Sequence, residues 1–181
     1  MGGVRLVVLD RDGTINRDSD AYIRNPEEWV PLPGSPEAIA RLNRAGYTVA
    51  VASNQSGVAR GLFDEDTLAR IHEKMHETVQ AAGGRIDRIV YCPHHPDAGC
   101  DCRKPAAGLL HRLARQYGVT LADVPVIGDS RRDLEAARAA GARPILVRTG
   151  NGAATEAAGE AGEAEVYDDL SAAADALAGE R

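Results

Sequence analysis

The chain has 181 residues, of which 44% are hydrophobic and 27% charged, and its formal net charge is -6 at pH 7. This length predicts a single domain, residues 1–181, with a core large enough to fold without disulfides. The acidic balance excludes general electrostatic binding to nucleic acid or to anionic lipid, because both need a basic surface. Without an apolar run of membrane-spanning length or a signal-peptide pattern, we expect a cytoplasmic protein that does not bind membranes.

Short apolar runs without polar alternation recur along the chain and predict strands that are covered on both faces. Helical segments or long loops separate them, so strand and helix alternate. This order predicts an α/β fold, a doubly wound and mainly parallel sheet with helices on both faces. The predicted strands are 6–9, 48–52, 89–91, 124–127 and 144–147, with a short last strand at 166–167.

Capping residues delimit the helices between these strands. Ser35 before Pro36 is typical of a helix start, and Gly46 of a helix end. The further predicted helices run from Asp64 to the pair Gly83 and Gly84, from Leu109 to a stop at Gly118, from Leu134 to a stop at Gly141, and over 170–177. Residues 153–165 hold no large apolar side chain, so we expect a mobile or marginally helical connector there.

Two acids follow the first predicted strand in the run DRDGT, which starts at Asp10. Open α/β sheets bind their ligands at the carboxyl ends of parallel strands. Asp10 and Asp12 point the same way in extended geometry, where like charges repel by about 4 kcal/mol at 4 Å. One of them could simply cap a turn before Gly13. A cation would relieve the repulsion between the two, and this favours a metal site.

The fourth predicted strand delivers another acid, Asp129, to the same sheet edge. Asp10, Asp12 and Asp129 could therefore converge on Mg²⁺, which prefers carboxylate oxygens, waters and phosphate. Asp133 follows at the start of a helix, where an acid is favoured by the helix dipole as readily as by a supporting role at the site. Both readings of Asp133 stay open.

Residues that could hold an anion follow two other elements. Ser53 and Asn54 stand where the second predicted strand ends, and the Ser53 hydroxyl could donate to a phosphate oxygen. Arg103 and Lys104 supply the local positive charge that an acidic chain needs for an anionic substrate. None of these four residues indicates a phosphate site on its own.

All three cysteines lie between Cys92 and Cys102, in a loop that also contains His94 and His95. Three thiols and one imidazole form a complete tetrahedral set for Zn²⁺, and clustering in a cytosolic chain favours metal over disulfide. A reduced loop with incidental thiols is the alternative. Four protein ligands leave no open position, so the predicted zinc site is structural. The other histidines, 72, 76 and 111, fall within helical patterns and are expected to be ordinary surface or partly buried residues.

Taken together, LVVLDRDGT, the Ser53 loop, Lys104-Pro105 and IGDSRRD resemble the four motifs of the haloacid dehalogenase superfamily of phosphatases. The similarity extends over about 4–150 and includes NQSGVARG from Asn54 and CPHH from Cys92. Within the superfamily the chain resembles the heptose 1,7-bisphosphate 7-phosphatases of ADP-heptose and lipopolysaccharide core biosynthesis. Histidinol-phosphate phosphatases share the pattern and are the nearest alternative.

The resemblance implies a role for each site residue. Asp10 is then the nucleophile that becomes an aspartyl phosphate, and Asp12 the general acid and base. Mg²⁺ would be bound by Asp10, the Asp12 backbone carbonyl and Asp129, while Lys104 and Ser53 hold the transferring oxygens. The zinc ligands implied by the family pattern are Cys92, His94, Cys100 and Cys102.

The length leaves no room for a large cap domain, so specificity is expected to come from loops, residues 18–29 and the zinc loop 92–102. Asn54 and Arg103 are the further substrate-binding candidates, Arg103 for the second phosphate of a sugar bisphosphate. Heptose phosphatases can carry Lys where this chain has Ser130. We expect a monomer acting on a small sugar bisphosphate; a noncatalytic zinc-stabilised interaction module is the remaining alternative.

Overall fold

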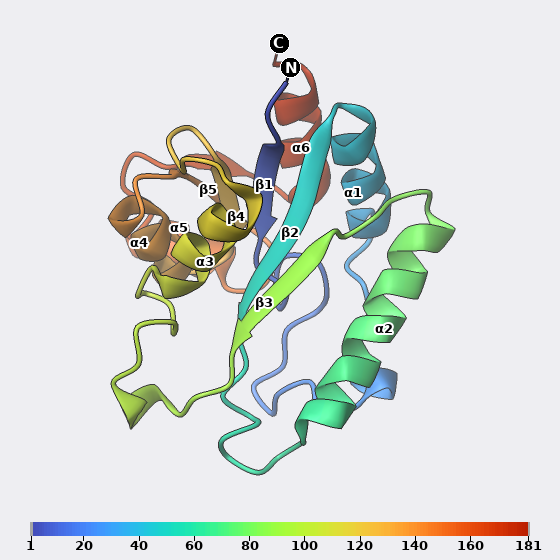
Figure 1. The fold of residues 1–181 in the computed structure, drawn as a ribbon, viewed down its shortest axis with the longest axis vertical. Coiled ribbons are helices and arrows are strands. Elements are labelled where there is room, and N and C mark those ends of the chain that lie inside the picture. Colours follow the sequence, from blue (N-terminus) through green and yellow to red (C-terminus); the bar gives the residue numbers. More distant parts are fainter. Residues whose placement is uncertain (1, 181) are drawn as a thin grey trace.

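The computed structural model describes residues 2–180 and contains a six-stranded sheet in which every neighbouring pair is parallel (Figure 1). The strand order is β3-β2-β1-β4-β5-β6, with β1 near the centre. The predicted doubly wound parallel sheet is confirmed. The strands are β1 (Arg5–Leu9), β2 (Tyr47–Asn54), β3 (Arg88–Cys92), β4 (Pro125–Gly128), β5 (Arg143–Val147) and β6 (Glu165–Tyr167).

Helices cover both faces of the sheet. In Figure 1, α1, α2 and α6 lie on one side of it and α3 and α4 on the other. The helices are α1 (Ser35–Arg44), α2 (Glu65–Ala81), α3 (Gly108–Tyr117), α4 (Arg131–Ala139), α5 (Gly152–Ala157) and α6 (Leu170–Ala178), with 3-10 turns at Pro26–Glu28 and Pro96–Ala98. No helix among residues 2–180 combines the length and the apolar character that crossing a bilayer requires.

Among the boundaries that differ from the sequence prediction, two bear on the site. The residue before α1 is Gly34, in the left-handed region, while Ser35 lies inside the helix and donates its hydroxyl to the carbonyl of Ile15. Likewise, β2 continues through Ser53 and Asn54, whose backbones pair with β3. The hydroxyl and amide side chains that were expected in a loop are therefore held by the sheet itself.

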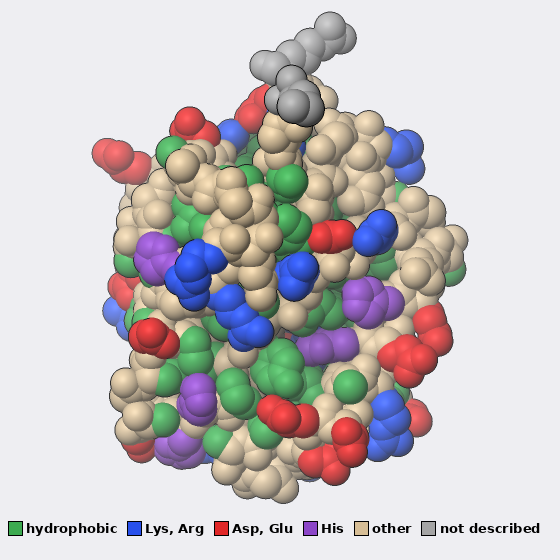
Figure 2. Space-filling model, in the orientation of Figure 1, with side chains coloured by type: hydrophobic (Ala, Val, Ile, Leu, Met, Phe, Trp, Pro, Cys, Tyr) green, Lys and Arg blue, Asp and Glu red, His purple; other side chains and the backbone are tan. Residues whose placement is uncertain are grey.

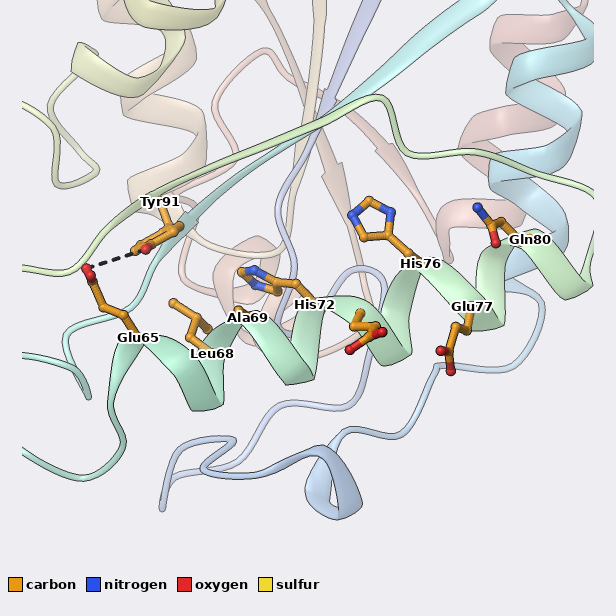
Figure 3. Close-up of a pocket in the computed structure, with 9 residues that line it drawn as sticks. Glu65, Leu68, Ala69, His72, His76, Glu77, Gln80 and Tyr91 are labelled. Carbon is orange, nitrogen blue, oxygen red and sulfur yellow. Dashed lines mark hydrogen bonds between the residues drawn. The ribbon is translucent and has the colours of Figure 1, made fainter.

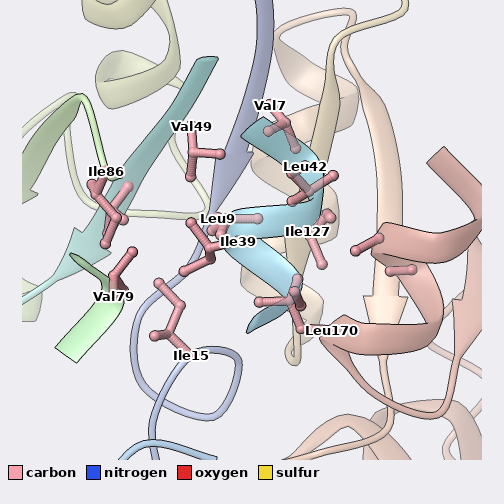
Figure 4. Close-up of a cluster of buried hydrophobic side chains, with 14 of the residues drawn as sticks. Val7, Leu9, Ile15, Ile39, Leu42, Val49, Val79, Ile86, Ile127 and Leu170 are labelled. Atoms are coloured by element: carbon pink, nitrogen blue, oxygen red, sulfur yellow. The ribbon is translucent and has the colours of Figure 1, made fainter. Parts of the chain in front are cut away.

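The core explains why β1 is a continuous apolar run. Val7 and Leu9 face the layer formed by α1, α2 and α6, where they join Ile39 and Leu42 of α1 (Figure 4). Leu6 and Val8 point to the opposite face and join a second cluster that includes leucines of α3. Burying each such side chain stabilises the fold by roughly 1.5–3 kcal/mol. A central strand buried on both faces gives the following acids a rigid base.

The segment 153–165 takes the helical form of the two alternatives in its first part, where α5 begins at Gly152. Thr155 is buried, and its hydroxyl donates to the backbone carbonyl of Asp129 at 3.1 Å. Ala161 is also buried, against Leu134 of α4. Short side chains here allow the chain to pack closely beside the carboxyl end of β4.

The loop between β1 and α1 is attached to α2. Lys74 Nζ donates to the carbonyl of Pro26 at 2.7 Å and to that of Trp29 at 2.9 Å. The Trp29 side chain is fully buried in the core, whereas Asp18, at the other end of the predicted wall, reaches the cleft described below. The loop that forms this wall of the cleft is therefore held in place by α2.

Candidate active site

The carboxyl ends of β1, β2 and β4 meet where the strand order reverses, since β2 and β4 are the two neighbours of β1. This position is the usual ligand site of open α/β sheets. A polar cleft lies there. It is lined by Asp10, Asp12, Asp18, Ser53, Asn54, Lys104, Asp129, Ser130, Arg132, Asp133 and Asn151.

Lys104 is the buried cation of the cleft. Its ammonium donates to Asp10 Oδ1 at 2.8 Å, to Asp133 Oδ1 at 2.6 Å and to the carbonyl of Ala52 at 2.8 Å. Burial acts to lower the pKa of Lys104, but the two carboxylates outweigh it and the pKa is raised. All three donors of the ammonium thus have partners, and Lys104 stays charged over the nucleophile candidate.

Asp133 serves both of the roles that its sequence position left open. One oxygen pairs with Lys104, and the other accepts from the backbone N–H of Ser130 at 3.1 Å and from its hydroxyl at 2.8 Å. Ser130 and Asp133 therefore form a capping box at the start of α4. One carboxylate therefore joins the start of α4 to Lys104.

The backbone at two glycines, Gly13 and Gly150, approaches Asp129 closely. A Cβ placed on Gly13, which has φ +84°, would lie 2.1 Å from Asp129 Oδ2, and one on Gly150 would lie 2.3 Å from the same atom. The Asn151 backbone N–H donates to this oxygen at 2.8 Å. Burial, then the charge of Asp133, raises the pKa of Asp129 to about 6. The absence of side chains at Gly13 and Gly150 is what gives Asp129 its place.

Asp10 sits between these groups. Burial, followed by the charge of Asp133, raises the pKa of Asp10 well above its ordinary value, while Lys104 acts in the opposite direction. One carboxylate oxygen from each of Asp10, Asp129 and Asp133 lies within 4.8 Å of the others. This surplus of negative oxygen ligands fits Mg²⁺, whose charge would favour their ionised forms.

The Asp12 side chain stands apart from that cluster and is held by a different set of donors. Arg11 donates to both of its oxygens, at 2.8 and 3.1 Å, with further bonds from Asn16 at 2.9 Å and Gln55 at 3.2 Å. Burial acts to raise the pKa of Asp12, yet Arg11 and these amides outweigh it, and the pKa lies below its ordinary value. Asp12 is therefore an ionised carboxylate beside Asp10.

Ser53 and Asn54 have distinct surroundings at the end of β2. The Ser53 hydroxyl accepts from Gln55 Nε2 at 2.8 Å, which leaves its own hydrogen for a ligand in the cleft. The Asn54 side chain amide donates to the carbonyl of Lys104 and accepts from its N–H, both at 3.0 Å. Asn54 thus fixes the backbone that carries Lys104.

Arg103 is the one predicted substrate-binding residue outside the cleft lining. Its Nη1 is buried and has no hydrogen-bond partner among the described residues. Burial, then the nearby charge of Arg132, lowers the pKa of Arg103, and Arg60 contributes in the same direction. Of these three arginines, Arg132 lines the cleft.

The four predicted zinc ligands come together. Cys92 Sγ lies 3.7 Å from Cys100 Sγ and 3.4 Å from His94 Nδ1, which is 3.2 Å from Cys102 Sγ. Zinc with metal–sulfur bonds of about 2.3 Å separates tetrahedral ligands by about 3.8 Å, so the donor set fits this ion. His95 points elsewhere, with its ring nitrogen accepting from the N–H of Asp97.

Sequence reasoning located the acids, Ser53, Lys104 and the zinc ligands, but it missed three contributors. Arg132 and Asn151 line the cleft, and Arg11 is fully buried behind it. The sequence does not indicate which residue of the adjacent pair Arg131 and Arg132 faces the cleft, because this depends on the orientation of α4. Arg11 stands between the two acids, and nothing in the sequence around it indicates a role at the site.

Comparison with known proteins places these residues in a family. The profile described as HAD-hydrolase-like matches residues 101–173, and the profile for polynucleotide kinase 3 phosphatase matches residues 5–132. The chain is 54% identical over 175 residues to D-glycero-beta-D-manno-heptose-1,7-bisphosphate 7-phosphatase of Bordetella bronchiseptica, covering 96% of this chain and 98% of that one. It is 52% identical to the Pseudomonas aeruginosa enzyme of the same name, over 95% and 97% of the two chains.

Solved structures agree. The crystal structure of the D,D-heptose 1,7-bisphosphate phosphatase from B. bronchiseptica, complexed with magnesium and phosphate, superposes with a TM-score of 0.94 at 54% identity, covering 96% of this chain and 98% of that chain. The corresponding phosphatase from Burkholderia thailandensis gives 0.76 at 47% identity, over 97% and 99%. This chain belongs to the D-glycero-beta-D-manno-heptose-1,7-bisphosphate 7-phosphatase family of haloacid dehalogenase-like hydrolases.

Proposed function

We propose that this chain is a Mg²⁺-dependent phosphatase that removes the C7 phosphate of D-glycero-beta-D-manno-heptose 1,7-bisphosphate, in ADP-heptose and lipopolysaccharide core biosynthesis. The observation that carries the proposal is the convergence of Asp10, Asp12, Asp129 and Lys104 on one cleft. Relatives that match over nearly their whole length bear names with this activity. The names of these relatives also specify the β anomer of the heptose substrate.

In the first step, a carboxylate oxygen of Asp10 attacks phosphorus, and the bond between phosphorus and the C7 oxygen breaks. Asp12 is ionised in the free cleft, but the dianionic phosphate of the substrate raises its pKa, so that Asp12 takes up a proton on substrate binding and gives it to the departing sugar oxygen. In the second step Asp12 takes a proton from water, the water oxygen attacks phosphorus, and the bond to Asp10 breaks to release inorganic phosphate. One acid two residues from the nucleophile serves both steps.

The remaining groups stabilise charge. Lys104, paired with Asp10 at 2.8 Å, is placed to hold a phosphoryl oxygen, and the Ser53 hydroxyl can donate to another. Asp10, the Asp12 backbone carbonyl and Asp129 would hold Mg²⁺, with Asp133 close behind. Bound there, Mg²⁺ offsets the repulsion between a carboxylate nucleophile and a dianionic phosphate.

The arginines favour a bisphosphate over histidinol phosphate. Arg132 lines the cleft, and its charge lowers the pKa of Arg103. Neither arginine forms an ion pair among the described residues. A second phosphate offers these guanidiniums bidentate partners. Histidinol phosphate has no second phosphate, and its own ammonium group would be repelled by this cluster.

We propose that the loop 92–102 binds a structural Zn²⁺ through Cys92, His94, Cys100 and Cys102. Cys92 is the last residue of β3, so the first ligand is anchored in the sheet. Arg103 and Lys104 follow the last ligand directly. A closed loop would hold both cations at the rim of the cleft.

Cellular setting and assembly form part of the same proposal. Three free cysteines arranged as metal ligands suit the reducing cytoplasm. The exposed large hydrophobic residues among 2–180, Val4, Val30 and Leu62, are few and do not form a broad apolar patch, which favours a monomer. On the face seen in Figure 2, a small group of basic side chains is surrounded by acidic and neutral ones, unlike the broad basic surface of nucleic-acid-binding proteins.

The decisive experiment measures inorganic phosphate released from heptose 1,7-bisphosphate and, in parallel, from histidinol phosphate. We expect a much higher kcat/KM for the heptose substrate and its loss in Asp10→Asn, with the circular dichroism spectrum unchanged. Faster release from histidinol phosphate would replace the proposed substrate by its alternative. No release from either would favour a noncatalytic module.

A further inference from the structure

Arg11 is a fully buried cation whose one ion-pair partner among the described residues is Asp12. Nε and Nη2 bind the two carboxylate oxygens, as a planar guanidinium does when it holds a carboxylate in one plane. The third nitrogen, Nη1, lies 3.2 Å from His72 Nε2. Arg11 therefore spans Asp12 and His72, and burial denies it water as an alternative partner.

The contact assigns the tautomer of His72. A guanidinium has hydrogens to donate and no lone pair to accept with, so His72 Nε2 must be the acceptor and the ring proton sits on Nδ1. Burial, then the charge of Arg11, lowers the pKa of His72 to about 3, which keeps the ring neutral. The neutral imidazole therefore gives the third nitrogen of the buried Arg11 side chain a hydrogen-bond acceptor.

His72 reaches this position from another element. Figure 3 shows its ring pointing from α2 toward the sheet, beside Leu68 and opposite Tyr91 of β3. The ring centroids of His72 and Tyr91 are 6.1 Å apart. Packing between α2 and β3 therefore fixes the His72 ring, and the ring in turn fixes the Arg11 guanidinium.

The proposal rests on the proposed function, in which Asp12 donates and accepts the proton. We infer that Arg11 and His72 are positioning residues for this reaction: Arg11 orients the Asp12 carboxylate toward the leaving oxygen, and His72 holds Arg11 in the required plane. Neither residue lines the cleft, so neither touches substrate. Asn16 and Gln55 complete the set of donors to the carboxylate, and neither of them lines the cleft.

A leaving-group comparison tests the inference. A sugar alkoxide needs a proton as it departs, whereas p-nitrophenolate leaves without one at neutral pH. The parameter kcat/KM reports the steps through phosphoryl transfer, which include this proton donation. We expect His72→Leu and Arg11→Met to lower kcat/KM for heptose 1,7-bisphosphate by about tenfold or more, and for p-nitrophenyl phosphate by much less. The loss should appear in kcat, with KM little changed.

Two further variants separate positioning from folding. His72→Gln keeps an acceptor facing Arg11 and should recover most of the activity lost in His72→Leu. Arg11→Lys keeps the charge but has a single nitrogen, so it cannot bind Asp12 and His72 in one plane. It should reproduce the selective loss, and it is the variant to measure if Arg11→Met does not fold. His76→Leu, one turn along α2, is the matched control and should behave as the unsubstituted chain.

The outcomes are distinct. An active unsubstituted chain whose variants lose the same factor on both substrates, or whose His72→Gln form is no better than His72→Leu, overturns the inference and leaves the proposed function standing. An unsubstituted chain that hydrolyses neither substrate overturns both.

Discussion

Lys104 Nζ lies 2.8 Å from Asp10 Oδ1, although 94 positions separate the two residues in the chain. The same ammonium binds Asp133 at the start of α4. One buried cation therefore joins the nucleophile candidate, the segment after the loop 92–102 and the start of α4. Several consequences for stability and turnover can be measured.

Lys104→Met should remove both turnover and stability. It leaves Asp10 and Asp133 facing each other without a cation, and loss of one partner from a buried ion pair costs about 3–5 kcal/mol. Urea denaturation without metal should show a fall of about this size in the free energy of unfolding. Added Mg²⁺ should restore part of the stability but not kcat. Unchanged stability would contradict the buried pairing.

Gly13→Ala should disturb the metal site through Asp129. The new Cβ would lie 2.1 Å from Asp129 Oδ2, and the φ of +84° adds about 1 kcal/mol of backbone strain. The matched control is Gly46→Ala, which has a similar φ of +94° and open space around it. We expect only Gly13→Ala to raise the Mg²⁺ concentration needed for half-maximal activity. Equal Mg²⁺ requirements would show that Asp129 does not depend on this glycine.

Cys102→Ser should release zinc and weaken turnover, although no zinc ligand lines the cleft. The expected cause is a looser connection to Arg103 and Lys104, which follow Cys102 directly. Metal analysis should give one zinc per unsubstituted chain and clearly less in the variant, together with a higher KM. His95→Ala alters the same loop without removing a ligand and should retain zinc. Unchanged zinc content and kinetics in Cys102→Ser would reject this link.

Acid should destabilise the fold partly through His72. Its pKa is about 3 when folded and about 6.5 in an unfolded chain, so between these values the unfolded state binds the extra proton. Stability therefore falls as pH drops through this window, by about 1.4 kcal/mol per pH unit from this one residue. Urea denaturation at pH 6.5, 5.5 and 4.5 should give a shallower dependence for His72→Gln. Parallel curves for the two chains would mean that the folded ring titrates normally.

Much of the fold could be predicted because local sequence and tertiary position agree. β1 is apolar throughout since both of its faces are covered, and Asp64 caps α2 with its side chain as the pattern indicates. The clustering of the acids follows from their positions at the strand ends, and that of the thiols from their short spacing, while the choice of His94 over His95 came from the family resemblance.

The missed features depend on contacts between distant segments. Nothing near Arg11 in the chain shows that it will be buried, since its partner His72 comes from a helix 61 positions away. The function of Asn54 was similarly hidden, because its amide is occupied by the backbone of Lys104. Side-chain partners of this kind are set by packing and not by periodicity.

The loop 92–102 leaves the sheet from β3, an edge strand with β2 as its single neighbour, whereas the nucleophile candidate Asp10 follows β1 in the interior. Residues 95–99, between the proposed ligands His94 and Cys100, can therefore be exchanged without any other strand having to move. We expect chimeras that exchange only this stretch, with both ligands kept, to change substrate preference while retaining bound zinc and the same reaction.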